Sequence, residues 1–370
     1  MNTLEKLKIL GAGAKYDTSC GGDERKRYPE KPVYGIYNAI AYGKCMPLLK
    51  VLQSNHCIHD CKYCFNSRDC KRTSFEPGEL AGVFRNFLSK GYVEGLFLSS
   101  GVVGDPDLAV EKVIETAEIV RKGGFGGYMH LKALPGVSRS NLERLGELAD
   151  RVSINIEAPS KGRLNELSGT KDFRIDILRR MGWLGEMKRK GRLKNFTTQF
   201  VLGANDESDI EYLDTCRWMY GKLGLWRAYF SAFSPVKGTP LGHKKGENPL
   251  REHALYQADW LYRVYRFAFE EVRGMVDESG FLPLGKDLKL HYANGVMANC
   301  PVDVNSAKFS ELLRVPGIGP RSAERIMKKR TAGKRITGIG ELKTMGVVVK
   351  RAMNFIIMDG GGRQGRLFEY

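Results

Sequence analysis

Short apolar stretches typical of β-strands alternate along the chain with longer stretches that have the apolar period of helices. The expected strands are 50–53, 96–99, 127–132, 152–156, 197–202 and 226–231. The expected helices between them lie at about 77–90, 107–122, 138–148, 171–190 and 207–223. Six alternations are typical of βαβ units around a parallel sheet, which right-handed crossovers curl toward a barrel. Because a closed barrel has eight units, the pattern predicts an α/β fold with a partial, TIM-like (βα)6 barrel.

The remaining stretches set the expected domain boundaries. A longer helix is expected at about 251–273, whereas 280–305 has few periodic signals and predicts a linker laid against the barrel. From Ser306 onward the composition is small, basic and helical. We therefore expect an irregular N-terminal segment over 1–49, a barrel with its C-terminal helix over 50–295, and a small all-α domain over 296–370.

Composition narrows the class of protein. The chain has 370 residues, 42% of them hydrophobic, which is enough for a large core and more than one domain. The N-terminus, MNTLEKLKILGAG, has no apolar run typical of a signal peptide, and no stretch is long and apolar enough to predict a membrane span. Eight cysteines are too few for a disulfide scaffold of this size. The expected compartment is the reducing cytoplasm, where clustered cysteines are metal ligands or catalysts.

The net charge of +17 favours a polyanionic partner, and its distribution is uneven. Residues 296–370 carry 14 lysines and arginines against 6 acidic residues, a net charge of +8. This is almost half of the net charge of the whole chain. A second basic run, 188-KRKGRLK-194, ends an amphipathic stretch and is interpreted as a solvated helix end. The distribution of charge therefore favours the C-terminal region as the part that binds a polyanion.

Residues 55–70, NHCIHDCKYCFNSRDC, contain three cysteines with C-x3-C-x2-C spacing. They are Cys57, Cys61 and Cys64. A structural zinc site has four ligands, so zinc would also need Cys70, His56 or His59. An electron-transfer [4Fe-4S] cluster takes four thiolates, which would require Cys70 to turn back. In a third arrangement the three cysteines hold a [4Fe-4S] cluster and leave one iron open for a ligand, as catalytic metal sites do.

The position of the three cysteines favours the third arrangement. They directly follow the first expected strand, at the mouth of the barrel where ligands bind, and Tyr63 stands just before the last of them. With this spacing and context the chain resembles the radical S-adenosylmethionine (SAM) superfamily. The resemblance implies that three thiolates hold the cluster and that SAM chelates its fourth iron. It also implies that an electron from the cluster cleaves SAM to a 5′-deoxyadenosyl radical, which abstracts hydrogen from a substrate.

The same resemblance implies where SAM binds. The end of the second strand supplies backbone to the SAM amine, and this chain has Ser99, Ser100 and Gly101 there, without the glutamate of the commoner GGE turn. The end of the fourth strand supplies polar groups to the ribose, and Asn155 and Glu157 lie there, two residues apart on one face. Gln199 and Gly203 of the fifth strand lie near the expected adenine position. Tyr63 is expected to join this cofactor site.

The sequence does not assign a role to two other cysteines. Cys70 is interpreted as a surface or half-buried thiol that binds no metal. Cys20 lies in a loop, where it would either pack as a small residue or donate hydrogen to a substrate radical. No catalytic acid, base or radical carrier is assigned from the sequence.

The second informative stretch is 312-LLRVPGIGPRSAERIMKKR-330. Gly317 and Gly319 allow a tight turn between two helices and the close approach of a large partner. The new helix exposes unpaired amides at its positive end, where Arg321, Ser322 and Arg325 add charge and hydrogen bonds. The stretch resembles the helix-hairpin-helix motif, which implies that it grips the nucleic-acid backbone without reading bases.

A fainter copy of this stretch follows 29 residues later. Leu313, Gly317, Ile318, Arg321 and Ala323 correspond to Leu342, Gly346, Val347, Lys350 and Ala352. Val348 replaces Gly319, so the second hairpin is expected to pack rather than bind. The competing interpretation, a glycine-capped turn in a protein-interaction domain, is disfavoured by the basic charge of the region.

The two motifs together resemble a family of DNA modification or repair radical SAM proteins over nearly the whole chain. The resemblance implies DNA as the nucleic acid, an electron donor such as a flavodoxin or ferredoxin, and a uracil-DNA-glycosylase-like partner, whereas the residues themselves leave DNA and RNA open. Our hypothesis is an enzyme that holds nucleic acid with its C-terminal module and makes a radical in its barrel. The alternatives are a nucleic-acid-binding Fe-S protein with a structural or redox-sensing cluster and no SAM turnover, and an enzyme whose C-terminal module docks a protein.

Overall fold

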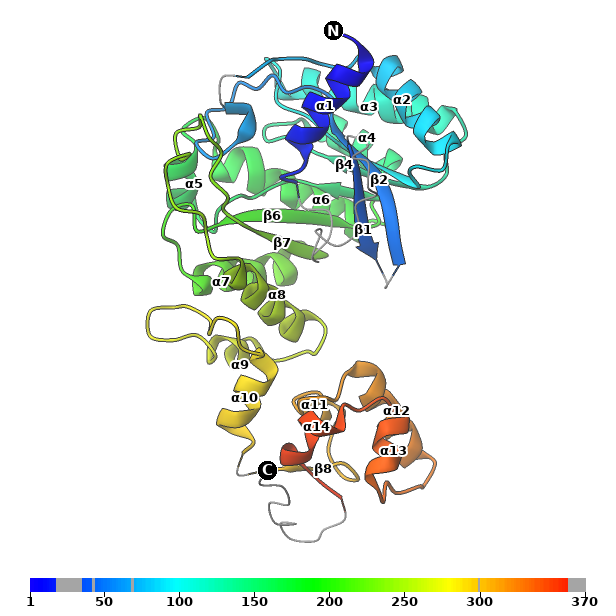
Figure 1. Cartoon of the computed structure of the whole chain (residues 1–370), viewed down its shortest axis with the longest axis vertical. Helices are drawn as coiled ribbons and strands as arrows, with labels where there is room; N and C mark the ends of the chain where they lie inside the picture. Colours follow the sequence, from blue (N-terminus) through cyan, green and yellow to red (C-terminus); the bar gives the residue numbers. More distant parts are fainter. Residues whose placement is uncertain (18–34, 42–43, 68–69, 299, 359–370) are drawn as a thin grey trace. The chain divides into compact units, whose positions relative to one another are not determined.

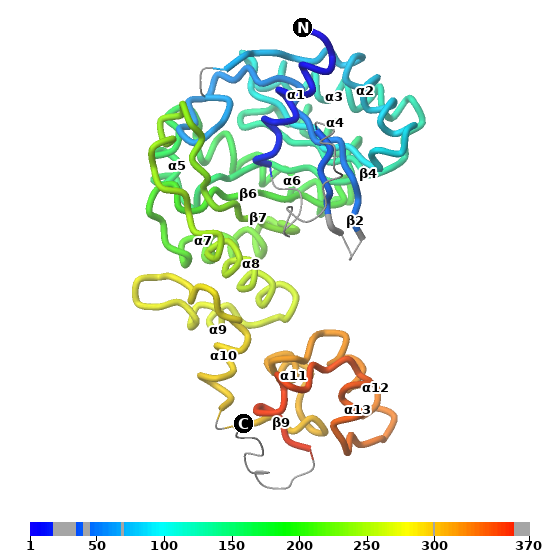
Figure 2. Tube along the Cα trace, in the orientation of Figure 1, coloured from blue at the N-terminus to red at the C-terminus, as the bar shows by residue number. Residues whose placement is uncertain are grey.

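The computed structural model describes residues 1–17, 35–41, 44–67, 70–298 and 300–358 and divides into two compact units. The first unit comprises Met1–Glu207 and Asp214–Asn248, and the second comprises Ser208–Leu213 and Pro249–Tyr370. Figure 1 follows the chain through both units, and Figure 2 traces the same path as a tube. The second unit therefore begins before residue 296, where we expected the C-terminal domain to start; those expected boundaries stay predictions.

A curled sheet of seven strands forms the centre of the described part of the first unit. In spatial and chain order these are β1 (Ile36–Ala41), β2 (Lys44–Leu52), β3 (Gly95–Ser99), β4 (Tyr128–Lys132), β5 (Arg151–Ser153), β6 (Phe196–Leu202) and β7 (Arg227–Ala232). Strands β2 to β7 are parallel, which confirms the predicted partial barrel of six strands. Strand β1 is an unpredicted addition that pairs antiparallel with β2.

The helices between the strands cover the outer face of the curled sheet (Figure 1). They are α2 (Pro77–Ser89), α3 (Pro106–Lys122), α4 (Arg139–Leu148), α5 (Lys161–Leu167), α6 (Arg179–Arg189) and α7 (Asp209–Trp218), after an N-terminal α1 (Thr3–Ala14). Local chemistry fixes their starts: Asp105 caps α3 and Ser138 caps α4. Every residue of β3 and of β6 is buried, as expected for parallel strands covered on both faces.

Four short segments of the first unit were not predicted as such from the sequence. A six-residue π-helical stretch, η3 (Phe173–Leu178), leads directly into α6, and another, η4 (Met219–Leu223), follows α7. Helix α5 was not predicted, because only two of its seven residues are buried and its apolar signal is correspondingly short. A single 3-10 turn, η2 (Phe65–Ser67), follows the cysteine stretch.

The predicted long helix over 251–273 is wrong, because the structure has two helices there. They are α8 (Pro249–Arg263) and α9 (Phe269–Arg273). Arg266, with a φ of 54°, adopts the left-handed conformation between them, which a continuous helix excludes. The predicted linker over 280–305 contains α10 (Leu288–Val296), whose N-cap Asp287 accepts a hydrogen bond from the Leu290 amide.

The rest of the second unit consists of short helices around their own apolar core. These are α11 (Phe309–Leu312), α12 (Pro320–Thr331), α13 (Ile339–Thr344), α14 (Val349–Ala352) and the 3-10 turn η5 (Met353–Phe355). Leu312, Ile318, Ile326 and Leu342 are fully buried in that core. The predicted helical character of this region is thus confirmed, and two short strands that were not predicted, β8 (Val302–Asp303) and β9 (Ile356–Ile357), pair beside the helices.

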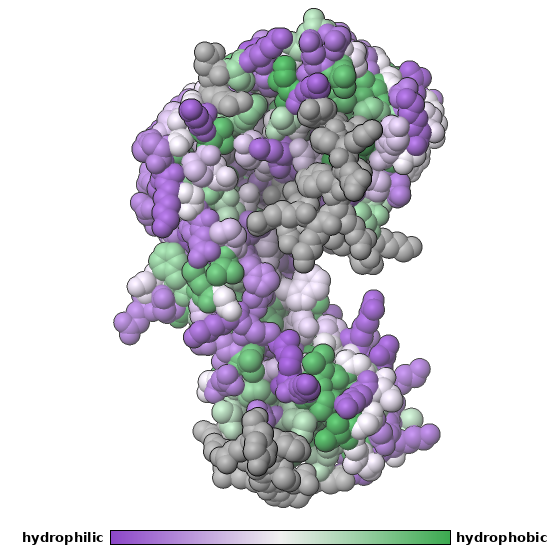
Figure 3. All heavy atoms as spheres, in the orientation of Figure 1, coloured by the Kyte–Doolittle hydropathy of each residue, from purple (hydrophilic) through white to green (hydrophobic). Residues whose placement is uncertain are grey.

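The visible face of the described residues is mostly hydrophilic, with scattered apolar side chains (Figure 3). Within the described part of the chain, none of the helices combines the length and apolar character that crossing a membrane requires.

Two glycines of α6 provide a matched test of this packing. A Cβ at Gly185 would lie 2.4 Å from the Leu223 carbonyl oxygen, whereas a Cβ at Gly182 would meet nothing within 4 Å. We expect Gly185→Ala to lower the free energy of unfolding by about 1–3 kcal/mol through overpacking. Gly182→Ala should raise it by about 0.5–1 kcal/mol, because alanine favours the helix. Urea unfolding followed by circular dichroism measures both, and equal shifts of the two midpoints would contradict the packing described.

Candidate functional site

The three cysteines lie in the loop that follows β2, at the carboxyl end of the strand. All three are reduced; Cys61 is buried, and Cys57 and Cys64 are partly exposed. The Cys64 amide donates to the Cys61 carbonyl over 3.0 Å, and the Asn66 amide donates to Cys64 Sγ over 3.4 Å. The last two thiols are thus part of one tight turn.

The turn after β3 packs directly on the cysteine loop. The Ile58 amide donates to the Val102 carbonyl over 2.9 Å, and the Gly101 amide donates to the Ser54 carbonyl over 2.8 Å. A Cβ at Gly101 would lie only 2.2 Å from the His56 carbonyl oxygen, so no larger residue fits without displacing backbone. Ser99 and Ser100 are buried beside it. The structure therefore brings the predicted SSG turn against the predicted metal-binding loop.

A carboxylate inside the cysteine loop ties the loop to the segment after α5. Asp60 accepts hydrogen bonds from Ser168 Oγ at 2.6 Å, Thr170 Oγ1 at 2.9 Å and the Gly169 amide at 3.1 Å. Burial would raise the pKa of Asp60, but these hydrogen bonds lower it to about 2. Sequence reasoning missed this contact, because nothing in the local pattern links residues 108 positions apart.

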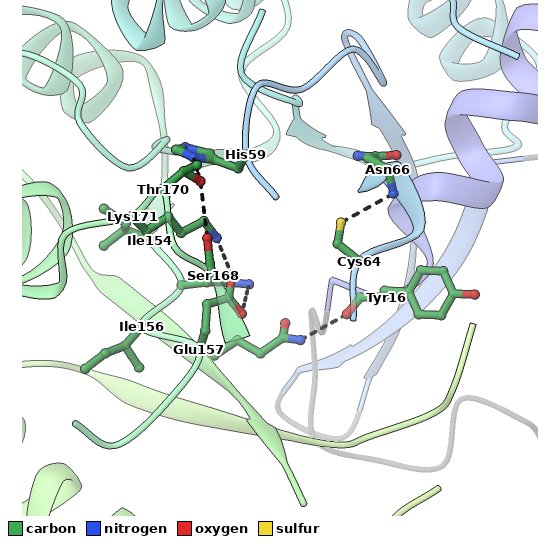
Figure 4. A network of polar contacts seen from close by, with 12 residues as sticks. Tyr16, His59, Cys64, Asn66, Ile154, Ile156, Glu157, Ser168, Thr170 and Lys171 are labelled. Carbon is green, nitrogen blue, oxygen red and sulfur yellow. Dashed lines mark hydrogen bonds and ion pairs between the residues drawn. The ribbon is translucent and has the colours of Figure 1, made fainter. Parts of the chain in front are cut away.

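A buried ion pair lies next to the same loop. Lys171 Nζ is 3.5 Å from Glu157 Oε1, and both side chains are less than a tenth exposed. Burial would lower the pKa of Lys171, but Cys61 and Glu157 raise it well above its ordinary value. Figure 4 shows Lys171, Ser168 and Glu157 grouped opposite Cys64 and Asn66. Lys171 is a site residue that sequence reasoning missed.

Two predicted cofactor residues touch this pair. Asn155 Nδ2 donates to Glu157 Oε2 over 3.5 Å, and Glu157 has a left-handed backbone with a φ of 65°. A glutamate is rarely found in this conformation, and such strain concentrates at functional sites. Burial and the Glu157 carboxylate raise the pKa of the half-buried Tyr63 well above its ordinary value. Tyr63 therefore joins the cysteine loop to the Asn155–Glu157 segment.

The last predicted cofactor residue lies deeper in the barrel. Gln199 Nε2 donates to the Tyr16 carbonyl over 3.0 Å and lines a narrow pocket together with Asn155. In the same segment, Asp17 is paired with Lys132. The segment after α1 thus covers part of the barrel interior. Cys20 lies outside the described residues.

The donor set fits an iron-sulfur cluster in its chemistry. Burial, with Cys61 and Cys57 nearby, raises the pKa of Cys64 to about 12, so a positively charged metal centre would be needed to stabilise its thiolate. Cys70 Sγ accepts from Asn55 Nδ2 at 3.8 Å and so has a different partner. Among the described residues, no group of three His, Cys, Asp or Glu side chains is already gathered at metal-binding spacing. The three cysteines that would hold the cluster therefore share a loop and an electrostatic environment.

In the second unit, the two predicted hairpins pack against each other. Gly317 has a φ of 85°, and a Cβ there would lie 2.4 Å from the Val348 carbonyl oxygen. The Val348 amide donates to the Gly317 carbonyl over 2.9 Å, so the second hairpin contributes an amide to packing. From α10, Lys289 Nζ donates to the Ile318 carbonyl over 2.6 Å. The first hairpin is thus held from two sides.

The N-terminus of α12 remains open to an anion. Gly319 is its N-cap and no side chain caps it, because glycine has none to offer. Within the described chain, the Gly317 and Gly319 amides have no recorded protein acceptor. Arg321 is exposed in the first turn of α12. Amides at a helix N-terminus beside a cation form an anion site.

Two of the predicted nucleic-acid contacts also have partners within the chain. Ser322 is buried and its Oγ donates to the Gly346 carbonyl over 2.9 Å. Arg325 Nη1 donates to the Met345 carbonyl over 3.2 Å. Both side chains therefore join the first hairpin to the second, and Arg321 is the one of the three predicted side chains for which no protein hydrogen bond is recorded.

Comparison with known proteins follows the same division. Residues 51–219 match the model of the Radical SAM superfamily. This part of the chain is thus similar to the radical SAM superfamily. Residues 298–352, in the second unit, match the model of the helix-hairpin-helix motif. No curated protein sequence matches the chain.

Solved structures with a similar trace include two enzymes named in hydrogenase maturation and in methylornithine synthesis. The FeFe-hydrogenase maturase HydG from Carboxydothermus hydrogenoformans is 13% identical, with a TM-score of 0.45 over 56% of this chain and 48% of that chain. Methylornithine synthase (PylB) is 16% identical, with a TM-score of 0.46 over 55% of this chain and 59% of that chain. The chain thus spans about half of the length of these structures.

A third structure is the radical S-adenosylmethionine methyltransferase TsrM from Kitasatospora setae, with tryptophan substrate and a SAM analogue bound. It is 12% identical, with a TM-score of 0.40 over 56% of this chain and 38% of that chain.

The partners of Ser322 generate a stability test. We expect Ser322→Ala to lower the free energy of unfolding by about 1–2 kcal/mol, because it removes a buried hydrogen bond to the Gly346 carbonyl. Arg321→Ala, at an exposed position of the same turn, should change it by less than about 0.5 kcal/mol. Thermal unfolding measures both, and equal shifts would show that Ser322 does not join the hairpins.

Proposed function

We propose that the chain is a radical SAM enzyme that modifies or repairs a nucleic acid, and that this nucleic acid is DNA. The observation that carries the proposal is the pairing of two motifs in one chain: a radical SAM domain over 51–219 and a helix-hairpin-helix motif over 298–352. The radical SAM match supports radical chemistry, and the helix-hairpin-helix match supports a nucleic acid as the polymer on which that chemistry acts. The proposed location is the cytoplasm.

The proposed metal ligands are Cys57, Cys61 and Cys64, which would leave one iron for SAM. The bound cluster and SAM would supply the 5′-deoxyadenosyl radical that abstracts hydrogen from the substrate. The Gly101 turn would present backbone to SAM from beside the cysteine loop, and Asp60 would hold that loop in place. Asn155, Glu157 and Gln199 would orient the nucleoside part from the adjoining strands, and Tyr63 would close the site beside Glu157.

The proposed contact with nucleic acid is the open N-terminus of α12. The Gly317 and Gly319 amides and the Arg321 guanidinium would bind a phosphate, which positions the strand without reading its sequence. Ser322 and Arg325 would support this hairpin from within. A duplex would need its target nucleotide extruded, because hydrogen abstraction requires direct contact. The electron donor, a flavodoxin or ferredoxin, and a uracil-DNA-glycosylase-like partner are further proposals, which rest on the family resemblance alone.

The cysteine assignment is tested by metal content and SAM cleavage. After anaerobic reconstitution, we expect about four irons and four sulfides per chain, and 5′-deoxyadenosine after reduction with SAM. Alanine at Cys57, Cys61 or Cys64 should abolish the product and lower the iron content. Cys70→Ala is the matched control and should retain both, because Cys70 contacts Asn55 instead. A stable cluster with no 5′-deoxyadenosine would favour the structural or redox-sensing alternative, and zinc in its place would contradict both.

The hairpin assignment is tested by DNA binding. A Cβ at Gly319 would meet only the Tyr265 hydroxyl within 4 Å, at 3.5 Å, so we expect Gly319→Val to fold and to obstruct the approach of a phosphate. We expect it to weaken DNA binding by roughly tenfold or more, and Arg321→Ala to reduce the slope of log K against log salt by about one. Gly340→Val is the matched control, because Gly340 has open space around it.

Fluorescence anisotropy with a labelled oligonucleotide at several salt concentrations measures these effects. Binding that is insensitive to salt and to Gly319→Val would contradict the assignment and favour a protein partner for this module.

A further inference from the structure

The strands of the barrel carry cations but no carboxylates. Strands β2 to β7 contain no aspartate or glutamate. They do contain Lys50, Lys132, Arg151 and Arg227, together with His130. Buried parallel strands are usually apolar throughout, and a buried charge is costly unless it is paired. The sequence of these strands therefore needs an explanation that packing alone does not give.

The cations share the inner face of the curled sheet with a narrow pocket. His130 is in register with Phe97 on one side and with Arg151 on the other, and Thr197 is in register with Arg227. Residues in register point to the same side of a sheet. Because Phe97 and Thr197 line the pocket, these cationic positions lie on the pocket side.

Arg151 has the contacts of an anion receptor. Its guanidinium lies 4.5 Å from the centre of the Trp226 ring, and its Nη1 donates to the Tyr229 hydroxyl, which belongs to a pocket residue, over 3.2 Å. Its Nε has no hydrogen-bond partner, and no ion pair to Arg151 exists among the described residues. The planar guanidinium of Arg151 is held against an aromatic ring and still has an N–H donor available for a ligand. This arrangement suits the oxygens of a phosphate.

Two deeply buried polar groups beside Arg151 also lack partners. Thr197 is fully buried and lines the pocket, and its hydroxyl has no hydrogen-bond partner among the described residues. His130 is 1% exposed; one ring nitrogen lies 2.8 Å from Ser153 Oγ, and Nδ1 has no partner there. Buried polar groups are almost always satisfied, so these atoms indicate a missing ligand.

The local charge balance favours an anion. Among the described residues that line the pocket, Asp17 is the one carboxylate, and it is already paired with Lys132. Burial, together with Arg151, Lys132 and Lys50, holds the pKa of His130 well below its ordinary value, so this imidazole stays neutral among three cations. Arg151 is therefore a cation of the inner face that has no ion pair among the described residues, and its neighbour His130 is neutral.

We propose that the inner face of the barrel binds a phosphate group of a nucleotide, with Arg151 and the Thr197 hydroxyl as its contacts. The nucleotide as the bearer of that phosphate rests on the proposed function, whereas the anion site rests on the strands themselves. Such a site would fix the substrate by its phosphate inside the barrel, separately from the hairpin.

The test compares ligands that differ only in phosphate. Thymidine 5′-monophosphate, a thymidine dinucleotide, thymidine and inorganic phosphate are titrated calorimetrically, at fixed ionic strength, into the full-length reconstituted protein. The protein carries Gly319→Val to remove the hairpin contribution. We expect the phosphate-bearing nucleotides to bind at least tenfold more tightly than thymidine and than inorganic phosphate. Equal affinity for thymidine and its monophosphate would overturn the proposal, and equal affinity for inorganic phosphate would overturn the nucleotide assignment.

Variants identify the contacts. Arg151→Met should weaken nucleotide binding at least tenfold and Arg151→Lys by less, whereas Arg144→Met, at a surface arginine paired with Glu118 on the outer helices, should leave it unchanged. Thr197→Val should weaken binding severalfold without lowering the unfolding midpoint, because the hydroxyl that it removes has no hydrogen-bond partner among the described residues. This second variant keeps the test decisive if Arg151→Met does not fold. Unchanged binding in Arg151→Met or in Thr197→Val would overturn the proposal.

The assay for SAM cleavage is independent of this one. Phosphate-dependent binding through Arg151 without 5′-deoxyadenosine would support the anion site and contradict the proposed function. The opposite result, cleavage of SAM with no dependence of binding on phosphate, would contradict the anion site and leave the proposed function standing.

Discussion

The close contact between the backbone at Gly101 and the cysteine loop is the constraint on which the rest of the candidate site depends. With 2.2 Å between the His56 carbonyl oxygen and a Cβ at Gly101, the two loops have no tolerance for a side chain. Asp60 adds a second attachment to the segment after α5, and the Lys171–Glu157 pair reaches back to the next strand end. Three segments far apart in sequence thereby contact one short loop, in which the structure describes the 3-10 turn η2.

The sequence predicted the parts of the fold that follow from local repetition. Six parallel strands and most of the helices between them were visible because each element buries its own apolar face. The break between α8 and α9 was not, because Arg266 in a left-handed conformation leaves the apolar period on either side intact. Helix α10 and strand β1 also escaped prediction: the apolar period of the first is weak, and the second depends on pairing with β2.

The candidate site divides in the same way. Spacing was enough to point to Cys57, Cys61 and Cys64, because their ligand chemistry is carried by residues close together in the chain. Asp60 and Lys171 act through partners that only the folded chain brings near, so no local pattern identifies them. Ser322 and Arg325 illustrate the converse: their residue types suit phosphate, yet the fold directs them to carbonyls of the second hairpin. The repeat in the sequence thus corresponds to two hairpins that pack together, and the predicted ligand contacts stay predictions.

The segment that covers the barrel interior comes from the very beginning of the chain. The Tyr16 carbonyl meets Gln199, 183 residues later, and Asp17 meets Lys132, 115 residues later. During synthesis the chain emerges from its N-terminus, so this segment leaves the ribosome long before either partner exists. Contacts of such sequence separation form late, since the loop between them must close first. The lining of the pocket is therefore completed only after nearly the whole barrel has been translated, and a ribosome that stalls before β6 leaves Tyr16 without its Gln199 partner.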